Sequence, residues 1–145
     1  MDPACLDLAL LAKGLGFKLA LHTAGIYPDR LGSMLKHLDW VGLDIKTIAD
    51  RYDTLTQRKN SFPPVARSLD RLLDWGGEFE CRTTWDPAWL PQDALLELAE
   101  TLSVKGVKSF AVQRYRDIGM FSARAELSAS SIDALRSMFS HFEYR

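Results

Sequence analysis

Cysteine is scarce in this sequence, and its scarcity limits the metal chemistry that the chain can support. Only Cys5 and Cys81 occur among the 145 residues, far apart and without a CxxC spacing. Two such cysteines cannot by themselves hold a structural zinc ion or a ferredoxin-like cluster. Cys81 also falls in a predicted buried strand, where a free thiol usually serves only for packing.

The sequence also lacks a long apolar run and an excess of either charge. No stretch reaches the roughly 18 consecutive apolar residues of a transmembrane helix, so we expect no membrane span. Acids rather than a basic leader precede the first apolar residues, which argues against a signal peptide. A formal net charge of −1 argues against bulk attraction to nucleic acid or anionic membranes. We therefore expect a cytoplasmic protein with neither kind of partner.

The remaining composition is that of a globular protein, with 47% hydrophobic and 26% charged residues. A chain of this length corresponds to about one domain. No low-complexity segment or linker divides it, so residues 1–145 are predicted to form a single domain.

Short runs rich in β-branched and aromatic residues alternate with segments of helical periodicity. This alternation predicts consecutive right-handed βαβ units, that is, an α/β fold with four parallel strands and about five helices. Four strands cannot close an eight-stranded barrel, so the prediction is a partial (βα) barrel. A polar stretch, residues 47–60, follows the second predicted strand, and residues 51–59 within it are predicted to be a solvated loop. The last helix is predicted to continue through Phe142. The predicted strands are residues 17–23, 39–46, 78–84 and 109–116.

The first predicted strand, residues 17–23, would have no neighbour on its outer side. An uncovered strand edge presents unpaired backbone groups that readily pair with another chain. The sequence therefore predicts a homo-oligomer that forms through this exposed edge.

Each predicted strand ends in polar side chains. In parallel α/β sheets, ligands bind outside the carboxyl ends of the strands, so these ends should form one shared rim. Asp44 and Lys46 alternate with apolar neighbours and should therefore point to the same face. The tryptophans are instead predicted to pack at element boundaries. The polar rim residues are His22, Thr23, Asp44, Lys46, Arg82, Thr83, Thr84, Gln113 and Arg116.

Four segments at the predicted rim together carry a family resemblance. In chain order they are Gly16-Phe17 with Thr23-Ala24-Gly25, residues 39–46, Arg82-Thr83-Thr84, and Gln113 with Arg116. Taken together, they resemble the radical S-adenosylmethionine (radical-SAM) superfamily. They are most similar to the activating enzymes of anaerobic ribonucleotide reductase, also called anaerobic ribonucleoside-triphosphate reductase activating proteins, and of pyruvate formate-lyase. The similarity extends over about residues 3–119, and its specificity comes from the order and spacing of the segments.

Two hallmarks of that family are missing from this sequence. Radical-SAM enzymes hold a 4Fe-4S cluster on a CxxxCxxC loop and the methionine amino group on a glycine-rich GGEP-type motif, and neither motif occurs here. The chain thus resembles the C-terminal portion of such a barrel. We expect that it cannot generate the adenosyl radical alone, and the sequence assigns no catalytic residue and no metal ligand.

The resemblance implies a fragment of an activating oxidoreductase. The complete enzyme would cleave S-adenosylmethionine and generate a glycyl radical on a partner reductase. The rival interpretation is a non-catalytic βα domain for protein association, or the product of a truncated reading frame. Arg82 could equally form an ion pair with Asp44 or Glu80, and Asp44 and Lys46 could simply close the strand. The residues implied to bind the cosubstrate are Thr23, Asp44, Lys46, Arg82 and Gln113.

Overall fold

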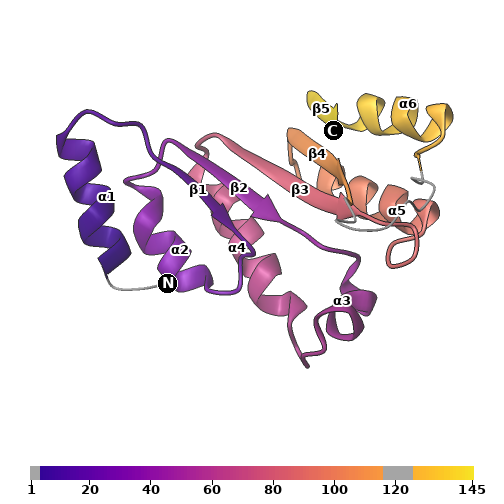
Figure 1. Ribbon diagram of the computed structural model, residues 1–145, viewed down its shortest axis with the longest axis horizontal. Coiled ribbons are helices and arrows are strands. Elements are labelled where there is room, and N and C mark those ends of the chain that lie inside the picture. Colours follow the sequence, from indigo (N-terminus) through magenta and orange to yellow (C-terminus); the bar gives the residue numbers. More distant parts are fainter. Residues whose placement is uncertain (1–3, 116–125) are drawn as a thin grey trace.

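The computed structural model describes residues 4–115 and 126–145. Five strands form one parallel sheet in the order β1-β2-β3-β4-β5, and helices separate consecutive strands along the chain (Figure 1). The strands are β1 (Ala20–Thr23), β2 (Trp40–Asp44), β3 (Phe79–Trp85), β4 (Ser109–Arg114) and β5 (His141–Tyr144). The helices are α1 (Ala4–Gly14), α2 (Pro28–Leu35), α3 (Ala49–Thr56), α4 (Phe62–Trp75), α5 (Gln92–Val104) and α6 (Ala129–Met138).

The predicted α/β class and the parallel order of the first four strands are confirmed, but the sheet has one more strand than predicted. The last helix was predicted to reach Phe142, whereas α6 ends at Met138 and Phe139 is already extended, with φ −125° and ψ 148°. Phe142 then lies in β5 beside Phe110 of β4. The apolar residues near the end of the chain fit the period of a helix as well as that of a strand. Packing against β4 favours the strand.

Residues 51–59 were predicted to be a solvated loop, but helix α3 (Ala49–Thr56) includes the first part of this segment. Tyr52 is the one buried residue within this helix. A helix with so narrow an apolar face gives almost no periodic signal in the sequence.

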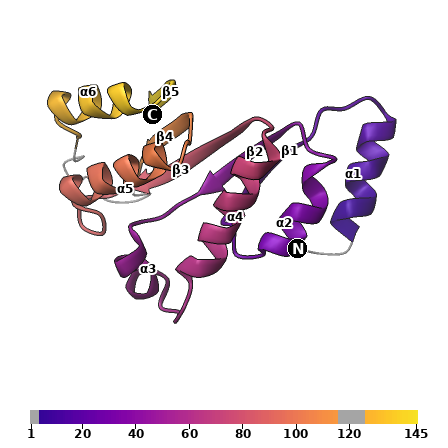
Figure 2. The same ribbon diagram turned by 180° about the vertical axis from the view of Figure 1, so that it is seen from behind.

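The two faces of the sheet differ in chemistry. Alternate residues of the central strands, among them Leu43, Cys81 and Phe110, point into the hydrophobic core. We call this side the helix-covered face, and Figure 2 shows α2, α4 and α5 in front of the strands on it. The residues between them, such as Asp44 and Arg82, are partly exposed on the opposite, open face. The sheet therefore has the form of an opened barrel wall with a polar inner surface.

Helix α1 lies at the β1 end of the molecule and packs little on the rest of it (Figure 1). Leu8 and Leu11 are 67% and 62% exposed, and their spacing of three residues places them on one side of the helix. As predicted, β1 is an edge strand. None of the helices that the structure describes is both long and apolar enough to cross a membrane.

Candidate functional site

A pocket of about 480 Å³ opens at the carboxyl ends of β2 and β3, on the rim where the sequence predicts a site. We call it the rim pocket. It combines charged residues from the strand ends with aromatic and apolar residues from the segments that follow them, including the end of α3. Its lining residues are Asp44, Ile45, Lys46, Leu55, Thr56, Arg82, Thr84, Asp86, Trp89, Leu90 and Tyr115.

The centre of the rim pocket is an ion pair between neighbouring strands. Asp44 and Arg82 are register partners, so both side chains emerge on the open face. The Nε and Nη2 atoms of Arg82 donate to Oδ1 of Asp44 at 3.0 and 2.6 Å. The Arg82 side chain is only 12% exposed, against 39% for Asp44. Two of the five guanidinium N–H donors are used here, so Arg82 is held rigidly and can still bind an anionic ligand.

Of the two ion pairs considered for Arg82, the structure therefore shows the one with Asp44. Glu80 pairs instead with Arg145, whose Nη2 lies 2.9 Å from Oε1 of Glu80. Arg145 reaches Glu80 from the end of β5, across Ala111 of β4. The acids Asp44 and Glu80 on the open face thus each have a separate arginine.

Buried hydrogen bonds fix the end of β2 below the rim pocket. The hydroxyl of Thr83 donates to the carbonyl of Ile45 at 2.7 Å, and the N–H of Ile45 donates to the carbonyl of Arg82 at 2.8 Å. The N–H of Lys46 donates to the hydroxyl of Tyr52 at 3.2 Å. Burial raises the pKa of Tyr52, which therefore stays a neutral phenol. Lys46 consequently follows a strand end that cannot easily shift.

Three of the five predicted ligand residues, Asp44, Lys46 and Arg82, meet in the rim pocket, whereas Thr23 and Gln113 do not line it. Thr23 is the register partner of Leu43, on the helix-covered face, and its Oγ1 accepts a hydrogen bond from the N–H of Gly25 at 3.1 Å. Gln113 is the register partner of Thr84, one strand further along the open face.

Two further predicted rim residues complete this comparison. His22 is exposed and contacts Trp40 edge to face, with ring centroids 5.2 Å apart. Arg116 lies outside the described residues.

Sequence reasoning missed the aromatic side of the rim pocket. All tryptophans were predicted to pack, and Trp85 does so, with its indole N–H donating to the carbonyl of Leu90 at 2.9 Å. Trp89 is instead 65% exposed at the pocket, together with the exposed Tyr115. Both follow strand ends within loops, and that position was the only signal in the sequence that could have indicated them.

The described residues do not fit an iron–sulfur cluster. Cys81 is fully buried on the helix-covered face, and burial raises the pKa of its thiol, which disfavours a thiolate ligand. Within residues 4–115 and 126–145, no three His, Cys, Asp or Glu side chains are grouped to hold a metal ion. The charged and aromatic residues that line the rim pocket suit it to an organic ligand with charged groups.

Comparison with known proteins places this geometry in context. No family model matches the sequence. The chain is 25% identical over 118 residues to a Methanocaldococcus jannaschii protein provisionally named a glycyl-radical enzyme activating enzyme. The match covers 77% of this chain and 48% of the relative, so the chain spans about half the length of the curated relative it matches.

Solved structures share the fold at low sequence identity. A domain of the pyruvate-formate lyase-activating enzyme of Bacteroides vulgatus superposes with a TM-score of 0.77 at 11% identity, covering 97% of this chain and 88% of that domain. Streptococcus suis SuiB superposes with a TM-score of 0.64 at 11% identity, covering 96% of this chain and 35% of SuiB. A second SuiB structure, bound to S-adenosylmethionine, gives 0.61 at 12% identity, with 96% and 34% covered.

These findings confirm the resemblance to radical-SAM activating enzymes that the strand-end segments predict. They also confirm the α/β fold of a partial barrel.

Proposed function

We propose that the rim pocket binds S-adenosylmethionine and that this chain is one part of a radical-SAM activating enzyme. The observation that carries the proposal is the Asp44–Arg82 pair, with Lys46 beside it, at the carboxyl ends of adjacent parallel strands. The methionine carboxylate would bind Arg82, and the exposed rings of Trp89 and Tyr115 offer stacking surfaces for an adenine. A volume of about 480 Å³ lies within the range of about 300–1,000 Å³ of small-molecule sites.

Thr23 and Gln113 stay predicted ligand residues at the same edge of the sheet. Neither lines the pocket, so their contacts would require a ligand that extends along the rim towards β1 or β4.

The cluster that such an enzyme needs would come from polypeptide beyond the described residues, and this chain would be the cosubstrate-side fragment. When bound, a 4Fe-4S cluster supplies the electron that cleaves S-adenosylmethionine. The β1 edge and the exposed apolar side of α1 support this division, because together they offer a pairing site for a strand and a packing site for its helix. A glycyl-radical reductase as the partner, a cytoplasmic location and a single domain over residues 1–145 remain predictions.

Titration calorimetry with S-adenosylmethionine tests the ligand proposal. We expect saturable binding, and we expect Arg82→Met to raise Kd at least tenfold, equivalent to about 1.4 kcal/mol. Arg71→Met is the matched control, because Arg71 also pairs with an aspartate, Asp29, but on helices α4 and α2 away from the pocket. Equal affinity of the parent and Arg82→Met would contradict the proposal.

The rival function is a non-catalytic domain for protein association. The exposed apolar side of α1 and the free β1 edge are the observations that favour it. This rival predicts no heat of binding for S-adenosylmethionine. Anaerobic reconstitution distinguishes the fragment proposal from a self-sufficient enzyme: formation of 5′-deoxyadenosine by this chain alone would show that it holds its own cluster.

A further inference from the structure

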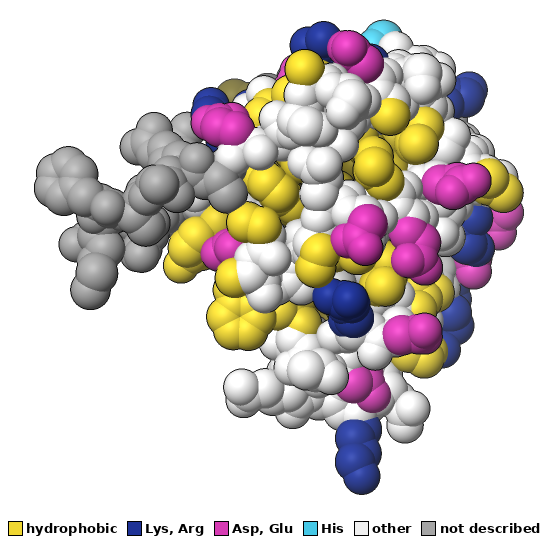
Figure 3. All heavy atoms as spheres, turned by 90° about the vertical axis from the view of Figure 1, so that its right-hand side faces the viewer, with side chains coloured by type: hydrophobic (Ala, Val, Ile, Leu, Met, Phe, Trp, Pro, Cys, Tyr) yellow, Lys and Arg dark blue, Asp and Glu magenta, His cyan; other side chains and the backbone are white. Residues whose placement is uncertain are grey.

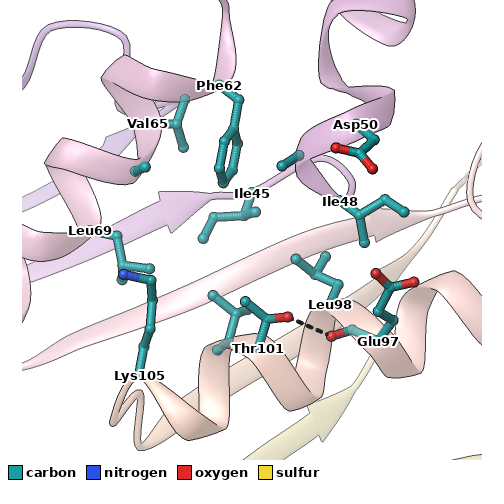
Figure 4. A pocket seen from close by; sticks show the side chains of 13 residues that line it. Ile45, Ile48, Asp50, Phe62, Val65, Leu69, Glu97, Leu98, Thr101 and Lys105 are labelled. Carbon is teal, nitrogen blue, oxygen red and sulfur yellow. Dashed lines mark hydrogen bonds between the residues drawn. The ribbon is translucent and has the colours of Figure 1, made fainter.

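The layer of helices on the covered face has a gap between α4 and α5. Helix α2 packs on α4, and α5 packs on α6, but α4 and α5 are not among the closely packed pairs. A cavity of about 210 Å³ lies between them (Figure 4). It is on the helix-covered face and so on the opposite side of the sheet from the open face. Its lining is mainly apolar, from the end of β2, the start of α3 and both helices: Ile45, Ile48, Phe62, Val65, Leu69, Leu98 and Leu102. We call it the α4–α5 groove.

The two ends of the α4–α5 groove carry different charges. At one end Lys105 and Asp70 form an ion pair of 3.0 Å that links α5 to α4 and neutralises both groups. At the other end Asp50 and Glu97 line the groove, and Figure 4 shows their carboxylates on either side of Ile48. Neither carboxylate has an ion-pair partner among the described residues. This end of the groove is therefore negative.

The negative charge continues along α5. Asp93, Glu97 and Glu100 are spaced by four and three residues, so they form one stripe on the exposed side of the helix. We call it the α5 acidic stripe. Figure 3 shows the side of the molecule on which α5 and α6 lie, where acidic, basic and apolar side chains are all exposed. None of the three has a basic partner in the part of the chain that the structure describes. Like charges at these spacings repel one another along a helix, and a basic partner would remove this repulsion.

We propose that the α4–α5 groove binds a basic amphipathic helix of another protein. Apolar side chains of that helix would enter the groove, and its lysines or arginines would lie on the α5 acidic stripe. The charge excludes an acidic segment. The volume favours a side-chain anchor over a metabolite, because small-molecule sites usually enclose about 300–1,000 Å³. This inference is independent of the function proposed for the rim pocket.

A synthetic helix of leucine and lysine, with its leucines on one side, is the probe. We expect it to bind in fluorescence anisotropy and to shift the methyl NMR signals of Val65, Leu69, Leu98 and Leu102. Ala66→Phe fills the groove, because Ala66 lines it and is half-buried, and should weaken binding at least tenfold. Ala129→Phe, at the exposed start of α6 outside the groove lining, is the matched control and should leave binding unchanged.

Charge and shape are tested separately. The double substitution Glu97→Gln with Glu100→Gln should weaken binding of the peptide several-fold. It should also make the affinity less dependent on salt concentration. A scrambled leucine–lysine peptide that binds equally well would overturn the proposal, since the attraction would then be charge alone. Unchanged binding to Ala66→Phe would overturn it too. The proposal would also be overturned if hexylamine shifted these methyl NMR signals and the peptide did not, because the groove would then be a small-molecule site.

Discussion

Two fully buried threonines close to the end of β2 differ in their hydrogen bonding. The hydroxyl of Thr83 donates to the carbonyl of Ile45 at 2.7 Å, whereas the Thr47 hydroxyl has no partner among the described residues. Thr83→Val leaves a buried carbonyl unpaired and should lower the free energy of unfolding by about 1–3 kcal/mol. Thr47→Val removes an unpaired hydroxyl and should be neutral or stabilising by up to about 1 kcal/mol.

Urea unfolding of both variants checks this pair, and each variant is the other's control because the substitution and the burial are identical. Equal destabilisation would mean that Thr47 finds a partner in solution. The Thr83 bond also holds the strand end that carries Lys46, so Thr83→Val should weaken S-adenosylmethionine binding while Thr47→Val leaves it unchanged.

At the residue scale, the sequence predicts what depends on strand period alone. Asp44, Lys46 and Arg82 follow from alternation along strands that end at a common edge, and they do meet. Thr23 depends on register, since a shift of one residue moves a side chain to the other face, and no single-strand pattern supplies that register. Trp89 depends on the path of a loop, which the sequence specifies only weakly.

At the scale of elements, Asp39 links helix α1 to the start of β2. Lys13 donates to both carboxylate oxygens of Asp39, at 2.8 and 2.7 Å, and the N–H of Leu19 donates at 2.6 Å. These bonds, that of Lys13 first, lower the pKa of Asp39 below its ordinary value. The stabilisation is therefore present above the unfolded-state pKa of about 3.9 and is lost as the pH falls through the lower folded-state pKa.

We expect α1 to detach in acid before the sheet unfolds. The amide signal of Leu19, followed by NMR during an acid titration, should report a midpoint below about 3.9, the ordinary pKa of an aspartate. In Asp39→Asn this transition should be absent and the α1 amides should exchange faster at neutral pH. A Leu19 signal that titrates at or above the ordinary value would show that the Asp39 bonds do not persist in solution.

The element order could be predicted wherever an amphipathic face is broad. Helices α4 and α5 bury several side chains each and were predicted, whereas α3 buries only Tyr52 and was missed. Strand β5 has four residues, and its Phe142 completes an apparent helical period until contact with Phe110 decides its conformation. The failures thus fall where tertiary contacts, rather than local pattern, determine the structure.

At the scale of the whole molecule, the described part of the chain has one face of a parallel sheet uncovered, and its two edge strands, β1 and β5, each pair with one strand only. Fully parallel sheets are normally covered on both faces, which makes this arrangement unusual for a molecule that is complete in itself. The polar open face lowers the cost of exposure, but the β1 edge and the apolar side of α1 have no such compensation. We therefore predict association at that end of the sheet.

The β1 edge can be tested with a single substitution. The carbonyl of Leu19 accepts from Asp39 and Trp40, towards β2, so the backbone groups of Ala20 and His22 point to the open edge. Ala20→Pro removes an outward N–H without breaking the ladder to β2, and should change the free energy of unfolding by less than about 1 kcal/mol. Sedimentation should show concentration-dependent association of the parent chain and a monomer for Ala20→Pro.

Leu8→Lys with Leu11→Lys should weaken association as well, since both leucines lie on the exposed side of α1. A parent chain that stays monomeric at high concentration would show that the edge is protected without a partner, and the division of the barrel between two polypeptide segments would lose its physical reason.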